Sequence, residues 1–294
     1  MIETSYFAPA DVREARSLLA RHPSAAVLAG GTDLVVGARS GKRQLPELII
    51  AIHRLQELRG IEHLASGGLK IGALTTHGDL EASSEVMRSW SAISDAAALV
   101  GSPATRHLGT VGGNLCNASP AMELGSPLLV FDASVELAAK GRRRRVPVSS
   151  FLLGPGRTAA APGELLTAVT LPAKQKRFSA GSAYLRLDYR QAMEIAVVGA
   201  AAHIAVDKRG RCRLARVALT AVAPTCIRVP DAEEQMVGAR LDDELIDRAA
   251  HTAAAAARPI DDVRATAGYR REMVAVIVAR AVGRALARAG GDAA

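Results

Sequence analysis

The sequence is poor in the residues that build several kinds of functional site. Aromatic side chains make up only 3% of its 294 residues, which is too few for the base-stacking surfaces of many single-strand binders. The three cysteines are odd in number and widely spaced, so neither a disulfide framework nor a zinc or iron–sulfur site is indicated. The seven histidines form no His-x-x-x-His or Glu-x-x-His pair, and we expect no metal site.

Long apolar runs are also lacking. No segment reaches the roughly 18 uninterrupted apolar residues that a membrane span needs, and Met1–Ser5 lacks the charged-then-apolar plan of a signal peptide. A cytoplasmic location is therefore expected. Apolar residues make up 49% of the chain and charged residues 22%, a balance that favours a packed core. The length favours two domains.

Positive charge is in excess, with a net charge of +8. Such a balance permits a basic nucleic-acid-binding module, although the arginines are spread over the whole chain. One dense cluster, Arg142–Arg145, follows Lys140-Gly141 and precedes Val146–Val148. This pattern predicts the tip and return strand of a hairpin. The cluster is either a solvated hairpin or a docking patch for an acidic partner.

Residues 1–175 alternate between helical and extended patterns. Asp11 is a predicted N-cap, and Val12, Ala15, Leu18 and Leu19 then share one helical face. A first subdomain, about 1–55, is expected to hold strands at 25–29 and 48–52 and a helix at 34–39. A second, about 56–175, is expected to hold strands at 69–74 and 164–172, a helix at 91–100, a buried helical turn at 127–131 and a hairpin at 134–148.

The pattern changes after the polar run Lys174–Arg177, which is a candidate linker. Residues 182–190, 202–206 and 213–221 favour strands, and Asp207–Gly210 favours a hairpin turn. Helices are expected at about 231–237, 242–256 and 267–289. The segment 178–294 is therefore predicted to be a separate domain with a three-stranded antiparallel sheet covered by helices.

Two glycine pairs stand out in the first 175 residues. Gly30-Gly31 lies where a strand is expected to turn into a helix, and Gly112-Gly113 lies in the stretch Thr110–Pro120. Glycine lets backbone N–H groups approach a ligand and form an anion-binding nest, and a helix N-terminus favours phosphate. Two such nests facing each other predict a diphosphate clamp. Taken singly, each pair is equally compatible with a tight turn that binds nothing.

The spacing of these motifs resembles that of a known family. AGGTDL at 29–34, followed by TVGGNLCNASPAMELGSPLL at 110–129, resembles the FAD-binding medium subunit of molybdenum hydroxylases, of the xanthine dehydrogenase, carbon monoxide dehydrogenase and aldehyde oxidase type. The resemblance covers essentially the whole chain. It implies an α+β architecture: a two-subdomain FAD-binding fold of the vanillyl-alcohol oxidase type over 1–175, followed by the family's C-terminal domain over 178–294.

The resemblance also implies which residues surround the diphosphate. The residues that match the family's first loop, which wraps the FAD diphosphate, are Leu28, Ala29, Gly30, Gly31, Thr32, Asp33 and Leu34. The residues that match its second loop, around the diphosphate, ribitol and ribose, are Thr110, Gly113, Asn114, Asn117 and Ser119.

Further positions are implied beyond the two loops. Glu123 matches an acidic position, usually Asp, that accepts a hydrogen bond from a ribose hydroxyl. Val100–Gly101 matches positions lining the isoalloxazine. Arg186 stands where the family often has Lys, and a cation there can sit by the flavin pyrimidine edge. Leu165 and Leu166 either pack on the adenine or belong to the plain core.

The resemblance implies non-covalent FAD, because Thr32 stands near the place where some relatives of the fold have the histidine used for covalent attachment. No catalytic residue is expected, since the flavin carries the chemistry. Molybdopterin and [2Fe–2S] centres are expected only in partner subunits, and FAD would pass electrons to NAD⁺, oxygen or another acceptor. The alternatives are a stand-alone FAD-dependent reductase or oxidase of the same fold and a basic nucleic-acid-binding module.

Overall fold

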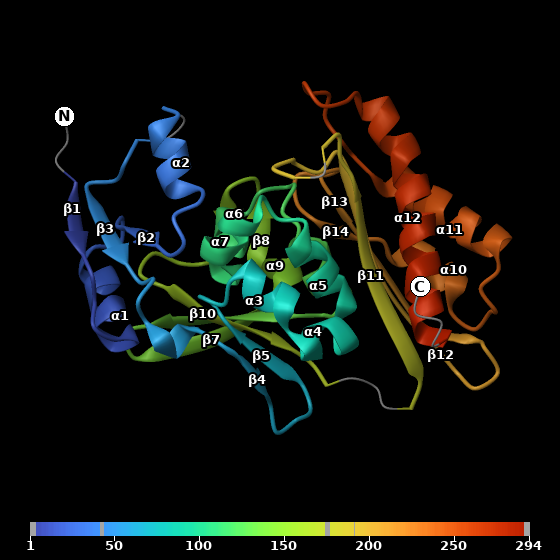
Figure 1. Ribbon diagram of the computed structural model, residues 1–294, viewed down its shortest axis with the longest axis horizontal. Helices are drawn as coiled ribbons and strands as arrows, with labels where there is room; N and C mark the ends of the chain where they lie inside the picture. The colour runs from blue at the N-terminus through green and yellow to red at the C-terminus, as the bar shows by residue number, and fades with distance from the viewer. Residues whose placement is uncertain (1–3, 42–43, 174–176, 191, 291–294) are drawn as a thin grey trace.

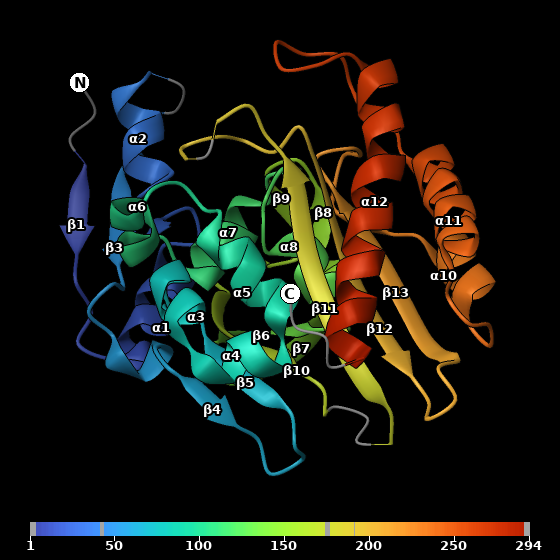
Figure 2. The same cartoon turned by 45° about the vertical axis from the view of Figure 1, so that its right-hand side comes forward.

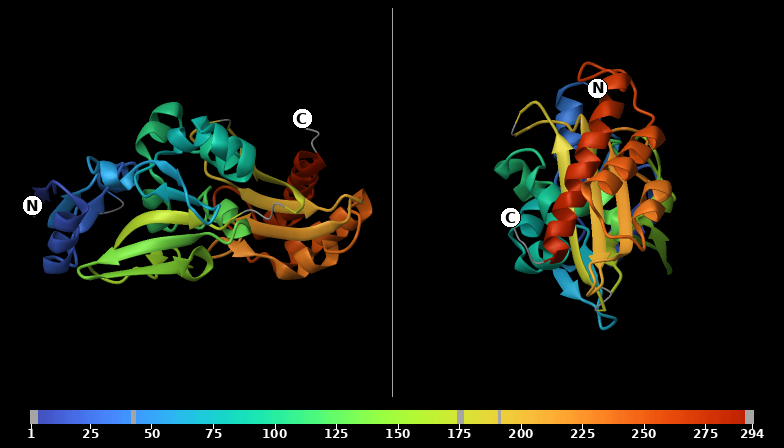
Figure 3. Two further views of the ribbon diagram at one scale, coloured as in Figure 1. Left: turned by 90° about the horizontal axis from the view of Figure 1, so that it is seen from below. Right: turned by 90° about the vertical axis from the view of Figure 1, so that its right-hand side faces the viewer.

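The structure is a computed structural model that describes residues 4–41, 44–173, 177–190 and 192–290. Figure 1 shows three parts in a row, each built on its own sheet. Seen from below, the molecule is elongated, with its first strand and its last helix at opposite ends (Figure 3). The described helices include none that is long and apolar enough to cross a membrane.

The N-terminal part is a three-stranded parallel sheet with helices beside it. Its elements are β1 (Ser5–Phe7), α1 (Val12–Arg21), β2 (Ala26–Leu28), α2 (Leu34–Arg39), β3 (Leu48–Ala51) and the 3-10 helix η1 (Gln56–Leu58). The strand order is β1-β3-β2, and both neighbouring pairs are parallel. Asp11 caps α1 by accepting a hydrogen bond from the backbone N–H of Glu14. Leu18 and Leu19 of α1 pack in one core cluster with Ile50 of β3.

The middle part is an antiparallel five-stranded sheet covered by short helices. Its sheet has the order β4-β5-β10-β6-β7, made of β4 (Ile61–His63), β5 (Leu69–Gly72), β10 (Leu165–Leu171), β6 (Ser134–Ala139) and β7 (Arg142–Pro147). The short strands β8 (Leu152–Gly154) and β9 (Arg157–Thr158) pair beside it. The helices are α3 (His77–Ala82), α4 (Ser84–Ser89), α5 (Ser91–Ala98), α6 (Pro103–Leu108), α7 (Val111–Asn117), α8 (Gly125–Val130) and α9 (Val148–Phe151).

The C-terminal part is an antiparallel sheet between two helical layers. Its elements are β11 (Ser179–Leu187), β12 (Val198–Val206), β13 (Cys212–Thr220), β14 (Ile227–Arg228), α10 (Pro230–Met236), α11 (Asp243–Ala256) and α12 (Ala267–Gly290). Helix α12 covers one face of the sheet, and α5 and α8 contact it from the other side (Figure 2). Small side chains permit this close packing, because a Cβ on Gly181 would lie 2.3 Å from the backbone oxygen of Ala285 in α12.

Most predicted elements are present, including the arginine-bearing hairpin of β6 and β7. The predicted three-stranded C-terminal sheet gains the two-residue strand β14 as a fourth. The short helices α4 and α6 were not predicted. Of the candidate linker, Lys174–Lys176 lies outside the described residues. One prediction is wrong: the stretch after Thr110 is the helix α7 rather than a loop of free N–H groups.

Candidate cofactor-binding site

The first glycine pair forms an open turn between β2 and α2. A Cβ on Gly30 would lie 1.8 Å from the backbone oxygen of Leu108, and Gly31 has φ of +74°, so both positions require glycine. The backbone N–H groups of Gly30, Gly31 and Thr32 have no acceptor within the described residues. Helix α2 has only six residues, so its dipole contributes little. The free N–H groups of the turn are the main feature that could bind an anion.

The second glycine pair is built differently, and its predicted N–H nest is absent. Thr110 caps α7, because its Oγ1 accepts a hydrogen bond from the N–H of Gly113 at 3.0 Å. The N–H of Gly112 donates to the backbone oxygen of Ala73 at 2.8 Å, and the N–H of Asn114 donates to that of Thr110. These donors already have partners, so α7 offers a ligand its side chains instead.

The two stretches meet. The side-chain amide of Asn117 donates a hydrogen bond to Oδ1 of Asp33 at 3.2 Å, which joins α7 to the first turn. The backbone of Leu108, just before the second stretch, lies directly against Gly30. The two distant glycine motifs therefore lie next to each other, as predicted. The first is a turn with free backbone N–H groups, and the second is a capped helix.

Polar side chains continue along the strip after α7. Oδ1 of Asn114 is buried and has no hydrogen-bond partner in the described part of the chain. Such an atom costs about 1–3 kcal/mol when it stays unsatisfied, so its burial here points to a ligand-related role for the amide. Oγ of Ser119 accepts a hydrogen bond from the N–H of Ala121 at 3.2 Å and holds the turn that follows.

The strip ends at a buried ion pair between the two large parts of the chain. Nη1 of Arg186, on β11, lies 2.6 Å from Oε1 of Glu123, and its Nε lies 2.8 Å from Oδ2 of Asp188. The Arg186 side chain is only 1% exposed. Its Nη2 is buried without a partner among the described residues. The guanidinium is thus held by two carboxylates and keeps one donor group unused.

Burial and charge act in opposite directions in this cluster. Burial raises the pKa of Glu123 to about 6, although the Arg186 guanidinium beside it acts the other way. Burial alone lowers the pKa of Arg186, but Glu123 and Asp188 outweigh it and the pKa is raised overall. At pH 7 the cluster therefore holds a charged guanidinium between two carboxylates.

Val100 and Gly101 lie at the edge of the same region. They follow α5, and Gly101 has φ of +52°. The N–H of Met193, in the β11–β12 connection, donates to the backbone oxygen of Gly101 at 3.1 Å. The next residue of that connection, Glu194, accepts a hydrogen bond from Arg186 through its backbone oxygen. Backbone contacts thus link the predicted isoalloxazine positions to the ion pair.

Leu165 and Leu166 lie in the hydrophobic core. They are neighbours on β10, with 3% and 5% of their surface exposed. Leu165 belongs to the core cluster under α1, and Leu166 belongs to the larger cluster of the middle part. Their positions favour the plain-core alternative over packing on an adenine.

Two residues of this region were missed from the sequence. Asp188 follows Arg186 at a spacing of two, which places both side chains on one side of an extended chain, and this spacing was a usable signal. His77 is only 2% exposed, and its backbone N–H donates to the backbone oxygen of Gly109, just before the second stretch. Burial, assisted by Arg106, lowers the pKa of His77 to about 4. No sequence pattern marked it.

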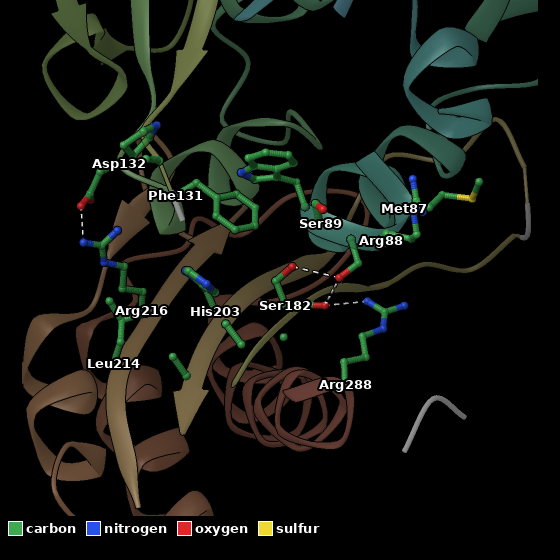
Figure 4. A pocket seen from close by; sticks show the side chains of 17 residues that line it. Met87, Arg88, Ser89, Phe131, Asp132, Ser182, His203, Leu214, Arg216 and Arg288 are labelled. Carbon is green, nitrogen blue, oxygen red and sulfur yellow. Dashed lines mark hydrogen bonds and ion pairs between the residues drawn. The ribbon is translucent and has the colours of Figure 1, made fainter. Parts of the chain in front are cut away.

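Among the described residues, no group of three or more His, Cys, Asp or Glu side chains could hold a metal ion. A cavity does exist between the middle and C-terminal parts (Figure 4), but none of the residues predicted to bind FAD lines it. The glycine turn, α7 and the ion pair therefore remain the candidate cofactor site.

Known proteins are similar to this chain over nearly its whole length. Residues 2–174 match the model of the FAD binding domain in molybdopterin dehydrogenase, and residues 183–285 match that of the CO dehydrogenase flavoprotein C-terminal domain. The xanthine dehydrogenase FAD-binding subunit of Escherichia coli O157:H7 is 33% identical over 287 residues, which cover 98% of this chain and 97% of that subunit. The carbon monoxide dehydrogenase medium chain of Hydrogenophaga pseudoflava is 33% identical, with 96% and 97% covered.

Solved structures also resemble this chain over nearly its whole length. Carbon monoxide dehydrogenase from Hydrogenophaga pseudoflava, in a form lacking the Mo-pyranopterin moiety of its cofactor, matches with a TM-score of 0.91 and 32% identity over 97% of this chain and 98% of that chain. Quinoline 2-oxidoreductase from Pseudomonas putida 86 matches with a TM-score of 0.89 and 27% identity over 98% of each chain. The chain therefore belongs to the family of FAD-binding medium subunits of molybdenum hydroxylases and carries that family's FAD-binding domain.

Proposed function

We propose that this chain is the electron-transfer flavoprotein of a multisubunit molybdenum hydroxylase. It receives electrons from [2Fe–2S] centres of a small partner subunit and delivers them to NAD⁺, oxygen or another acceptor, while a large subunit holds molybdopterin and oxidises the substrate. Bound FAD supplies the redox chemistry, and the chain positions it and tunes it electrostatically. The observation that carries the proposal is the set of free N–H groups at Gly30–Thr32, which faces α7.

The diphosphate is assigned to the glycine turn. The N–H groups of Gly30, Gly31 and Thr32 would donate to its oxygens, since they lack acceptors among the described residues and a nest of such groups binds anions. Asn114 on α7 has a buried, unpaired Oδ1, an acceptor that would suit a ribitol or ribose hydroxyl beside the diphosphate. The hydrogen bond between Asn117 and Asp33 fixes the spacing of the two sides.

The flavin end is assigned to Arg186 and to Val100–Gly101. The fixed charge of Arg186 would lie at the pyrimidine edge, where a cation stabilises negative charge on the reduced ring. The resemblance assigned Glu123 to a ribose hydroxyl, but its contact with Arg186 at 2.6 Å holds both side chains at one place. We therefore place Glu123 at the flavin end, where it orients the guanidinium.

FAD attachment is expected to be non-covalent. Thr32 occupies the position of the histidine that some relatives of the fold use for attachment, and a threonine hydroxyl offers no comparable nucleophile. The cofactor is then held by hydrogen bonds, charge and packing alone. Acid unfolding should release it completely into solution.

The absorption spectrum of the purified chain tests this function. Flavin bands in the near-ultraviolet and blue, released by acid, together with co-purification of molybdopterin and iron–sulfur subunits, are the expected result. A chain that binds neither FAD nor such subunits refutes the proposal. Rapid NADPH-dependent turnover of a small substrate by the isolated chain indicates the stand-alone reductase instead. A colourless protein that binds DNA or RNA in a salt-sensitive way indicates the nucleic-acid module.

A further inference from the structure

A cavity of about 620 Å³ lies where the middle and C-terminal parts meet (Figure 4). Its volume falls within the range of roughly 300–1,000 Å³ that is typical of small-molecule sites. The end of α4, the start of α5, the turn after α8 and the sheet β11–β13 surround it. The residues assigned to FAD do not contribute to its walls.

Aromatic and small side chains both line the cavity. The rings of Phe131 and His203 lie 4.9 Å apart between centroids and are inclined by 50°. Ala180, Gly181 and Ala205 also contribute to the lining. Aromatic rings beside small side chains suit an aromatic ligand.

The charged lining is mostly cationic. Arg88, Arg216 and Arg288 line the cavity, and the acidic lining residue is Asp132. Arg288 is neutralised by Asp95, since its Nη1 lies 2.7 Å from the carboxylate. Arg88 is 74% exposed at the rim, and its nearest acidic group, Glu85, is 3.8 Å away. Arg88 is therefore available to a ligand.

Arg216 belongs to an ionic cluster at the cavity wall, in which Arg228 also pairs with Glu233 at 2.5 Å. Arg216 forms an ion pair with Asp132, but the same carboxylate also accepts a hydrogen bond from Arg228 at 3.0 Å. Asp132 thus shares its charge between two cations. Burial lowers the pKa of Arg216, which means that its charged form lacks full compensation. An additional anion beside it would supply that compensation.

We propose that this cavity binds a small aromatic anion. The ring of the ligand lies along Phe131 beside the small lining residues, and its acidic group pairs with Arg216 and with Arg88 at the rim. A carboxylate or a phosphate satisfies this requirement, because guanidinium groups pair with both in a bidentate manner. The site is independent of FAD.

The full-length chain can be tested with 8-anilinonaphthalene-1-sulfonate, an aromatic anion that fluoresces when its surroundings become apolar. Its uncharged relative N-phenyl-1-naphthylamine is the matched ligand control. We expect saturable binding of the sulfonate, and weaker binding of the uncharged compound by about tenfold, which is the effect of losing one charge-assisted hydrogen bond. Equal affinity for both compounds would overturn the proposal.

Variants locate the binding. Arg216→Gln leaves Asp132 paired with Arg228 and should weaken sulfonate binding by about tenfold. Ala180→Trp fills the cavity from an exposed strand position and should remove this binding. The difference in sulfonate binding between this variant and the parent therefore measures binding in the cavity. Arg13→Gln changes an arginine that is 92% exposed on α1 and is the control for lost charge. Unchanged binding in Ala180→Trp contradicts the assignment.

Competition then identifies the acid. Displacement of the sulfonate by 1-naphthoate indicates an aromatic carboxylic acid, and displacement by AMP indicates a nucleotide phosphate. Either result supports the proposed class. The Ala180→Trp variant sets the concentration range in which the competitors do not affect sulfonate bound at other sites. If neither compound displaces the sulfonate from the parent within that range, the cavity does not recognise aromatic anions and the proposal fails.

Discussion

Replacing Gly30 by alanine should separate the two sides of the cofactor site. The added Cβ would lie 1.8 Å from the backbone oxygen of Leu108 and 2.6 Å from its carbonyl carbon, whereas real Cβ contacts stay above 3.0 Å. The turn and the Leu108 backbone must therefore move apart by about 1.2 Å, the difference between 1.8 and 3.0 Å. Backbone atoms cannot rotate away as a side chain can, so the displacement passes to Gly31 and Thr32.

The expected cost is set by the hydrogen bonds that this shift disrupts. Three backbone N–H groups, those of residues 30–32, are assigned to the diphosphate. A hydrogen bond to a charged group contributes about 1.5–3 kcal/mol, so losing one of them should raise the Kd for FAD by roughly 10- to 150-fold. Titration of the apoprotein with FAD, followed by quenching of flavin fluorescence, measures this constant.

Gly283→Ala is the matched control. This glycine lies in α12, far along the chain from the turn, and a Cβ there would meet nothing within 4 Å. Alanine should leave FAD affinity unchanged and stabilise the helix by about 0.5–1 kcal/mol. Thermal unfolding checks that both variants fold. If folded Gly30→Ala protein binds FAD as tightly as the parent, the turn does not hold the diphosphate.

Three further predictions concern single side chains. Asn114→Ala should raise the Kd for FAD about tenfold without lowering apoprotein stability, since Oδ1 has no partner within the described chain; titration and thermal unfolding measure both. Burial raises the pKa of Glu123 from 4.5 to about 6 in the folded chain. Between these two pH values the folded state therefore binds more protons than the unfolded state. Parent stability should therefore fall relative to Glu123→Gln as pH rises from 4.5 to 6 in urea unfolding. Hydrogen bonding to Arg144 lowers the pKa of Glu164 to about 2, so the parent's advantage over Glu164→Gln should be present above pH 4.5 and disappear as pH falls toward 2; a constant difference contradicts this.

Local patterns were sufficient to predict the elements that depend on near neighbours. Asp11 and the spacing of Leu18 and Leu19 predicted α1, because capping and a 3.6-residue period are properties of the chain itself. The same holds for the hairpin that carries Arg142–Arg145. There the structure adds the partners: Arg144 lies 2.6 Å from Glu164, and Arg145 lies 3.0 Å from Glu136. These pairs favour the solvated-hairpin alternative over a docking patch.

Helix α7 could not be predicted from local preference. Glycine is unfavourable in helices by about 1 kcal/mol relative to alanine, and Gly112-Gly113 therefore indicated a loop. The helix forms because tertiary contacts compensate: the N–H groups of Val111 and Gly112 donate to the backbone oxygens of Thr75 and Ala73. Those acceptors lie some 35 residues away in the sequence, where no short-range pattern marks them.

The ion pair of Glu123 and Arg186 was also outside the reach of pattern reasoning. Each residue was placed by resemblance alone, and the two are 63 positions apart. Only the packing of β11 against the middle part shows that they meet at 2.6 Å. That contact is the basis of our proposal that Glu123 orients the Arg186 guanidinium.

The two glycine pairs therefore have different physical causes. Gly30 and Gly31 are needed for a close backbone approach and a positive φ, and they leave donors free. Gly112 is needed because a Cβ would lie 2.9 Å from both Cβ and the backbone oxygen of Ala73, which is a requirement of helix–strand packing. Gly113 would bring its Cβ only to 3.0 Å of the Thr110 hydroxyl. In the proposed site, FAD binding would therefore depend directly on the first pair, whereas the second pair would act by positioning α7, which carries Asn114 and Asn117.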